Sequence, residues 1–113
     1  MTTVLRSLPK NKYGAIRITI DGITFDSKAE ANRYALLKLR EKAGEVYEVE
    51  LQKPFILSVE GRVIGTYRAD FAYYDATIKR NRVEDVKGKD TPLSKWKRKH
   101  VAAQYGVEVE IVR

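Results

Sequence analysis

Extended runs fill the middle of this sequence, and a helical pattern lies on either side of them. The helical patterns cover residues 27–44 and 93–105, because apolar side chains recur there every three to four positions. Residues 46–59, 63–74 and 82–87 have the composition and alternation of strands. A chain that combines strands and helices in this order packs its helices on a mixed sheet, so we expect an α/β or α+β fold.

A tight hairpin and a capped helix are expected before the sheet. Asp21 and Gly22 lie between alternating runs, a pattern typical of a two-residue turn, so residues 13–26 are predicted to form a hairpin. Ser27 begins the first helix as its N-cap. Glu30 follows three residues later, which is the spacing of a capping box.

Two further features complete the expected order of elements. Pro54 interrupts the run 46–59, so a strand or a strand pair is expected there. Residues 107–112 alternate again and form the last strand. After the hairpin, the order is therefore α-β-β-β-α-β over residues 27–113, with a mixed central sheet.

Apolar residues predict the buried faces of both helices. The first helix is apolar on two sides, so both are expected to be covered, one of them by a second subunit. One side carries Ala35, Leu36, Leu39 and Ala43, and the other carries Tyr34 and Leu37. The stripe of the second helix consists of Leu93, Trp96, His100 and Ala103. Trp96 is therefore expected in the core, and His100 in a packed position rather than in catalysis.

The composition favours a small nucleic-acid-binding protein. The 113 residues predict one domain with a single core, and the absence of cysteine excludes disulfides and thiolate-held zinc. Lys and Arg number 22 against 15 Asp and Glu, which gives a net charge of +7 and a pI near 9.7. Such a charge attracts the phosphates of DNA or RNA. A basic surface that only keeps the protein soluble is the alternative.

We expect no secretory signal at the beginning of the sequence. Residues 1–12 are basic and lack an apolar run, so we expect a flexible arm there. No stretch is long and apolar enough to span a bilayer, and no membrane partner is expected. An intracellular, reducing compartment fits these features and the absence of cysteine.

Two strand runs bring acidic side chains together. Asp70 lies within the run 63–74, and Asp85 and Lys87 lie two residues apart on one face of the run 82–87. Carboxylates and a lysine on neighbouring strands suit Mg²⁺ bound together with a phosphate. A cross-strand salt bridge is the alternative. However, aspartate is a poor strand former, so two aspartates within strands indicate a role beyond stability.

These residues resemble the signature of the PD-(D/E)XK nuclease superfamily, in particular its phage-encoded Holliday junction resolvases. Asp70 matches the first acid, and Asp85-Val86-Lys87 matches the second part of the signature. The resemblance implies a restriction-endonuclease-like core over residues 27–113.

One position departs from this signature, and a second offers an alternative acid. Ala69 lies where the signature has proline. Glu84, next to Asp85, would take its place if the register shifted by one residue, but Lys87 shares the face of Asp85. Gln52 and Gln104 are further candidates to support the centre.

The resemblance implies a role for each residue of the site. Asp70, Asp85 and the backbone carbonyl of Val86 are implied ligands of Mg²⁺, for which Mn²⁺ substitutes. Lys87 is implied to position the attacking water or to stabilise negative charge. Glu30 matches an additional acid of many members, which makes it a further candidate catalytic residue and metal ligand. The capping box is the competing explanation for Glu30.

Basic residues near this centre are expected to bind the DNA backbone without reading bases. They are Lys89, Lys95, Lys97, Arg98 and Lys99 around the second helix, Lys10 and Lys12 of the arm, and Arg17 of the hairpin. A solvated helix face is the alternative explanation for the helical ones.

The residues and the resemblance together predict a Mg²⁺-dependent endonuclease that resolves four-way junctions of phage DNA in the cytoplasm of a bacterial host. The preference for branched DNA comes from the resemblance alone. Symmetric cutting needs two active sites, so we expect a C2 homodimer, with the hairpin and first helix at its interface or exchanged between subunits. The alternatives are a nuclease of linear or nicked DNA, a non-catalytic nucleic-acid-binding module, and a protein–protein adaptor of phage replication.

Overall fold

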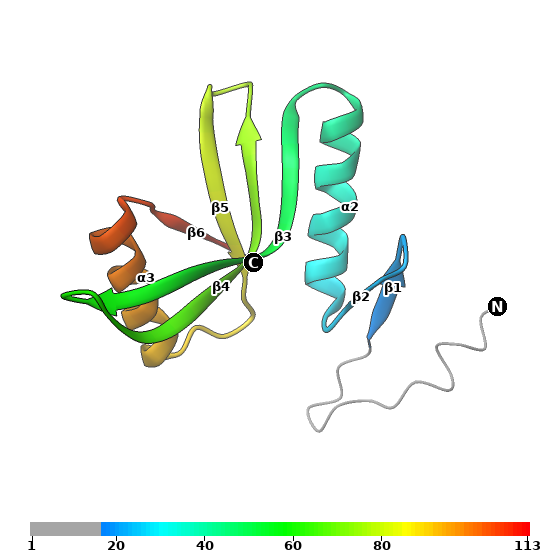
Figure 1. The fold of residues 1–113 in the computed structure, drawn as a ribbon. Coiled ribbons are helices and arrows are strands. Elements are labelled where there is room, and N and C mark those ends of the chain that lie inside the picture. The colour runs from blue at the N-terminus through cyan, green and yellow to red at the C-terminus, as the bar shows by residue number, and fades with distance from the viewer. Residues whose placement is uncertain (1–16) are drawn as a thin grey trace. The chain divides into compact units, whose positions relative to one another are not determined.

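The computed structural model describes residues 17–113, in which the elements follow the order β1, β2, α2, β3, β4, β5, α3, β6 (Figure 1). The chain divides into two compact units, Met1–Leu39 and Arg40–Arg113. The predicted α+β class and the order α-β-β-β-α-β after a hairpin are confirmed. The predicted arm, residues 1–12, lies outside the described residues. No helix within residues 17–113 is long and apolar enough to cross a membrane.

The first unit contains the predicted hairpin. Its strands are β1 (Ile18–Ile20) and β2 (Ile23–Phe25), which pair antiparallel. Asp21 and Gly22 form the turn with φ of 54° and 77°. Two consecutive left-handed residues are characteristic of a type I′ turn, whose twist matches that of the strands.

Helix α2 (Lys28–Lys42) begins at the predicted cap. The Ser27 hydroxyl accepts a hydrogen bond from the amide of Glu30 at 3.1 Å, which satisfies one of the free amides of the first turn. The Tyr34 hydroxyl donates to Asp21 Oδ2 at 3.0 Å, and the Tyr34 ring lies 5.1 Å from that of Phe25. The hairpin therefore packs against the helix within this unit.

Only one of the two apolar sides of α2 is buried. Tyr34 and Leu37 are buried, together with Ala31, whereas Leu39 is 63% exposed and Leu36 is exposed as well. The side that carries Leu36 and Leu39 is therefore exposed in the part of the chain that the structure describes.

The second unit contains a four-stranded mixed sheet in the order β3-β4-β5-β6. Strands β3 (Val46–Val59), β4 (Arg62–Asp75) and β5 (Arg80–Val86) run antiparallel, and β6 (Val109–Val112) is parallel to β5. The predicted break at Pro54 is wrong, because β3 continues through it. This strand is at the edge of the sheet. Proline has no amide hydrogen to donate, and an edge strand tolerates it because one side of the strand makes no ladder hydrogen bonds.

Helix α3 (Pro92–Tyr105) packs on one face of this sheet. The Thr91 side chain accepts the amide of Ser94 at 3.1 Å as the N-cap, and Gly106 ends the helix with φ of 69°. The core between α3 and the sheet consists of Phe55, Leu57, Tyr67, Ala69, Val83 and Val101.

The prediction that Trp96 is in this core is wrong, since Trp96 is 76% exposed. Hydrogen bonds from the last turn of α3 to the backbone of β3 accompany an orientation of the helix that differs from the predicted one. Gln104 bonds the Ser58 amide and the Ile56 carbonyl, and the Tyr105 hydroxyl bonds the same carbonyl. The predicted packing of His100 is confirmed: it is half-buried, with its Nε2 3.0 Å from the Ser58 carbonyl.

Candidate active site

Strands β3 and β4 both change direction near their middle (Figure 1). Gln52 of β3 has φ of 53°, a left-handed conformation that is uncommon for a residue with a side chain. Its amide Nε2 donates to Asp70 Oδ1 of β4 at 3.2 Å. Backbone conformations of this kind cluster at functional sites, so the bend marks Asp70 as a candidate.

The carboxylates of Asp70 and Asp85 meet where the ladder between β4 and β5 ends. The last backbone pair is Phe71 with Glu84. Beyond it, the amide of Asp70 donates to Asp85 Oδ1 at 2.8 Å, and the amide of Val86 donates to Asp70 Oδ2 at 2.9 Å. Each carboxylate thus accepts an amide of the opposite strand, and the structure brings the two predicted acids together.

One oxygen of Asp85 has no hydrogen-bond partner. Asp85 is 2% exposed, and within residues 17–113 its Oδ2 atom is buried without a donor. Lys87 Nζ lies 3.8 Å away, which is too far for a hydrogen bond. Burial raises the pKa of Asp85, and the Asp70 amide and the Lys87 charge oppose this effect only in part. This oxygen therefore has an ion-pair partner in Lys87 but no hydrogen-bond donor among the described residues.

Strand β6 fixes the backbone of Lys87. Its amide donates to the Val112 carbonyl at 2.9 Å, and Arg113 Nη1 donates to the Lys87 carbonyl at 3.2 Å. The Lys87 side chain is 24% exposed, so its ammonium group is beside Asp85 and still open to solvent.

These residues fit a small divalent cation. Mg²⁺ takes oxygen ligands, is commonly held by one or two carboxylates, and completes its shell with water and substrate phosphate. Asp70 and Asp85 supply the carboxylates, and the unpaired Oδ2 of Asp85 is a vacant acceptor. Across residues 17–113, no three or more His, Asp or Glu side chains group to hold a metal. Glu30 belongs to the other unit, and its metal role stays a prediction.

The structure places Asp85, not Glu84, beside Asp70. Glu84 is fully buried and accepts a hydrogen bond of 2.5 Å from the Tyr73 hydroxyl. Arg82 Nη2 lies 3.9 Å from the same carboxylate and forms an ion pair with it. The carboxylate of Glu84 therefore interacts with Tyr73 and Arg82.

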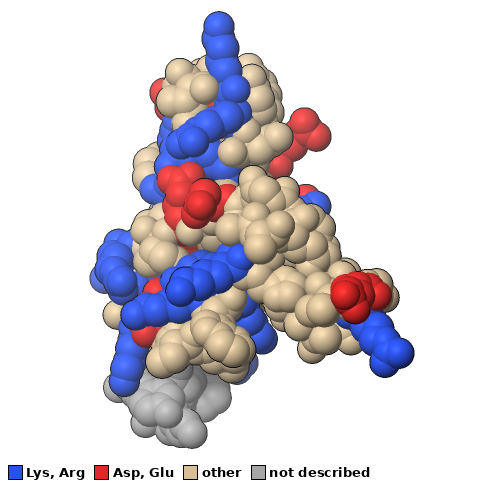
Figure 2. All heavy atoms as spheres, turned by 90° about the vertical axis from the view of Figure 1, so that its left-hand side faces the viewer, with Lys and Arg blue, Asp and Glu red and all other residues tan. Residues whose placement is uncertain are grey.

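The predicted DNA-binding residues differ in their surroundings. Lys89, Lys95 and Lys99 are exposed, and Lys97 is half-buried. On the surface drawn in Figure 2, Lys and Arg side chains predominate over Asp and Glu. Lys10 and Lys12 lie outside the described residues.

Two predicted DNA-binding arginines have acidic partners within the chain. Arg98 donates to Asp90 through Nη1 at 2.9 Å and Nη2 at 2.5 Å, and these bonds lower the pKa of Asp90. Arg17 lies 3.6 Å from Asp26 in the hairpin unit. Arg98 therefore holds the loop before α3, and any contact it makes with DNA is shared with Asp90.

Sequence reasoning missed Arg68, which lies beside Lys87 in a hollow at the start of α3. A signal was present, because Arg68 and Asp70 are two residues apart on one strand and so emerge on the same side. Of the two glutamines suggested as supports, Gln52 contacts Asp70, whereas Gln104 bonds β3 instead.

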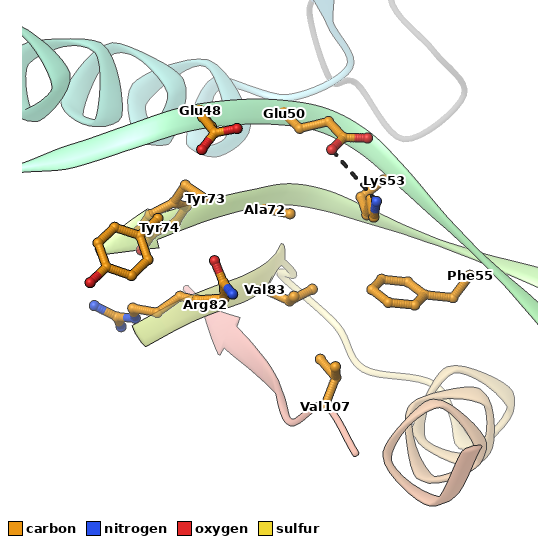
Figure 3. A pocket seen from close by; sticks show the side chains of 11 residues that line it. Glu48, Glu50, Lys53, Phe55, Ala72, Tyr73, Tyr74, Arg82, Val83 and Val107 are labelled. Atoms are coloured by element: carbon orange, nitrogen blue, oxygen red, sulfur yellow. Dashed lines mark ion pairs between the residues drawn. The ribbon is translucent and has the colours of Figure 1, made fainter. Parts of the chain in front are cut away.

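A separate hollow of about 330 Å³ lies over strands β3 to β5 (Figure 3). Its lining carries both charges, including a Glu50–Lys53 ion pair of 3.6 Å and Arg82. None of Asp70, Asp85 and Lys87 lines it. We therefore assign the candidate chemistry to the paired aspartates and not to this hollow.

One protein family shares most of this sequence. Its model, described as "Protein of unknown function (DUF1064)", matches residues 10–112, a range that includes Asp70, Asp85 and Lys87. No curated protein and no solved structure matches the chain. Because the family model spans far more than half of its residues, the chain belongs to the DUF1064 family.

Proposed function

We propose that this protein is a divalent-metal-dependent endonuclease that hydrolyses phosphodiester bonds of DNA. The observation that carries the proposal is the meeting of Asp70 and Asp85 at the end of the β4–β5 ladder, with Asp85 Oδ2 buried and unpaired among the described residues. The ion pair between this oxygen and Lys87 is 3.8 Å long, which exceeds hydrogen-bond distance, so the oxygen remains free to accept a further ligand.

Each residue of the site has a distinct part in the proposed reaction. Asp70 and Asp85 would hold Mg²⁺, with the Val86 carbonyl as a further ligand implied by the resemblance to PD-(D/E)XK nucleases. When bound, the ion would act as a Lewis acid and would lower the pKa of a coordinated water. Lys87 offers a charged donor to a phosphate oxygen as negative charge develops there. Gln52 orients Asp70 by donating to its Oδ1 atom.

DNA is the proposed substrate because of the charge on the chain. The net charge is +7, and the exposed lysines of α3 are close in sequence to the site. Contacts of this kind neutralise phosphates without reading sequence. The preference for branched DNA, in particular four-way junctions, rests on the resemblance alone.

A homodimer is proposed as the working form. Leu36 and Leu39 form an exposed apolar side of α2, which a second copy would cover. Light scattering coupled to size-exclusion chromatography should give twice the mass of one chain. Leu39→Glu should give the single-chain mass, and a monomeric wild type would contradict this part of the proposal.

The cleavage test uses a synthetic four-way junction, a flap and a linear duplex, each with Mg²⁺ or EDTA. We expect the wild type to cut in Mg²⁺ only, with the junction cut fastest. Asp70→Asn and Asp85→Asn should abolish cutting and retain DNA binding. Asp26→Asn, an exposed acid of the hairpin, is the matched control and should cut normally.

Each alternative gives a different result in the same assay. Equal rates on all three substrates would indicate a nuclease without junction preference. Binding without cleavage, unchanged by Asp85→Asn, would indicate a non-catalytic module. Absence of salt-dependent DNA binding would favour an adaptor.

A further inference from the structure

A basic hollow of about 250 Å³ lies next to Lys87, between β4 and the start of α3. It is lined by Thr66, Tyr67, Arg68, Lys87, Thr91, Leu93, Ser94 and Lys97. No Asp or Glu is among these residues, so the hollow combines positive charge with hydroxyl groups and suits an anion.

Two cations of this hollow have no acidic partner in the described part of the chain. The side chains of Arg68 and Lys97 form neither an ion pair nor a hydrogen bond with any of residues 17–113. Arg40, Arg82 and Arg98, by contrast, are each paired with an aspartate. The positive charge of the hollow is therefore available to a ligand.

Tyr67, one of the residues that line the hollow, has a buried hydroxyl without a hydrogen-bond partner in the part of the chain that the structure describes. Tyr67 is 5% exposed, and its hydroxyl makes no hydrogen bond within residues 17–113. A buried donor without an acceptor is costly and rare in folded proteins. This second observation, independent of the charge, shows that one polar group of a lining residue is not satisfied by the described part of the chain.

An apolar hollow of about 240 Å³ adjoins the basic one. The two share Leu93 and Lys97 in their walls. Trp96 and Ile64 line the apolar hollow, and both are largely exposed, so an aromatic face is open to solvent beside a set of unpaired cations.

We propose that the two hollows form a subsite for one unpaired nucleotide of DNA, with its phosphate in the basic hollow and its base against Trp96. A nucleotide carries an anion and a flat apolar face a short distance apart, as this surface requires. Stacking on an aromatic ring accepts any base but needs one that is free of its neighbours. Duplex DNA hides its base faces, whereas branched or frayed DNA exposes them.

This inference rests on the proposed function for the identity of the substrate and deepens it. It gives a physical reason for a preference for branched over duplex DNA, which otherwise comes only from resemblance. Because Lys87 lines both the basic hollow and the catalytic centre, the bound nucleotide would be next to the bond that is cut.

The test uses the fluorescence of Trp96, the only tryptophan of the chain. The full chain is titrated in EDTA, where no cleavage occurs, with a short oligothymidylate and with a blunt duplex of equal length. We expect the single strand to quench the fluorescence and the duplex to bind without a comparable change. Lys97→Met should weaken oligothymidylate binding roughly tenfold, as expected for a lost charged contact.

Matched variants separate this subsite from general charge. Lys95→Met removes the same charge two residues away, outside both hollows, and should weaken binding much less. Trp96→Ala should weaken binding of a labelled oligothymidylate, and its exposed position leaves the fold intact. The fluorescence of Asp85→Asn should be quenched by oligothymidylate as in the wild type, although this variant should not cleave DNA. The titration therefore tests the subsite, and the cleavage assay tests the proposed function.

Three results would overturn the proposal. They are equal quenching by duplex and single strand, equal effects of Lys95→Met and Lys97→Met, and a fluorescence change that follows protein concentration without DNA. The last would show that a second copy of the chain covers Trp96.

Discussion

Asp70 and Asp85 each accept a main-chain amide from the opposite strand, so both have a structural contact in addition to the proposed catalytic one. An asparagine side chain retains an oxygen acceptor of the same shape and loses the negative charge. Asparagine variants therefore test the charge while leaving the strand ends in place. Alanine variants would remove both the oxygen acceptor and the negative charge. A loss of activity could then come from disrupted strand ends or from the lost charge, and the two causes would not be distinguished.

Lys87→Met is predicted to slow cleavage without preventing metal uptake. The methionine keeps the length of the side chain but offers no donor to the developing charge. By analogy with the loss of a charge-stabilising donor in other enzymes, the single-turnover rate should fall about 10²- to 10³-fold. Lys79→Met, an exposed lysine in the turn between β4 and β5, should change the rate little. Equal rates for the two variants would exclude Lys87 from the chemistry.

Asp75 should make stability depend on pH in the acid range. Its buried carboxylate accepts hydrogen bonds from Thr77 and Arg82 and lies beside Arg40, which lowers its pKa well below the ordinary 3.8. A lowered pKa in the folded state stabilises the fold above pH 3.8, and this contribution is lost as the pH falls below that value.

Asp75→Asn should therefore lower the urea midpoint strongly at pH 7, and this loss should decrease steadily as the pH is lowered from 4 to 2. Glu108→Gln, an exposed acid, provides the control. A loss for Asp75→Asn that stays constant from pH 7 to pH 2 would show that the charge of Asp75 contributes nothing.

At the scale of elements, the sequence predicted those turns and helix caps that depend only on residues close together in the chain. The turn at Asp21 and the cap at Ser27 follow from side chains within three residues, and both are present. The exposure of Trp96 could not be predicted in this way. It depends on hydrogen bonds between Gln104 and β3 that join residues 46 to 48 positions apart.

The same distinction applies to the candidate site. The period of two in the strand predicted that Asp85 and Lys87 share a face, and Lys87 Nζ lies 3.8 Å from Asp85. The left-handed φ of Gln52 had no signal in the sequence, because such a conformation at a non-glycine residue arises from tertiary contacts. That Arg68 has no acidic partner in the described part of the chain likewise depends on where acidic residues of other elements lie, which the sequence alone does not show.

The N-cap of α3 is predicted to stabilise the helix that carries Lys97 and Trp96. Thr91→Ala removes the hydroxyl that accepts the Ser94 amide and should lower the free energy of unfolding by about 1 kcal/mol. Thr91→Ser keeps the hydroxyl and should restore most of the loss. Urea denaturation measures both, and equal destabilisation by the two variants would show that the cap contributes nothing.

At the scale of the whole molecule, the net charge of +7 governs how the protein approaches DNA. Phosphate contacts release counterions, so the logarithm of the binding constant should fall linearly with the logarithm of salt concentration. Lys99→Met should reduce the magnitude of this slope by about 1 and weaken all DNA sequences alike. A variant with an unchanged slope would show that the exposed face of α3 does not contact the backbone.

The central claim is that the carboxylates of Asp70 and Asp85 hold one divalent cation together. Electron paramagnetic resonance of Mn²⁺, with and without a DNA duplex, measures cation uptake directly. The wild type and Asp26→Asn should take up Mn²⁺ equally, and both Asp70→Asn and Asp85→Asn should lose most of this uptake. Equal uptake by the wild type and Asp85→Asn would contradict the account.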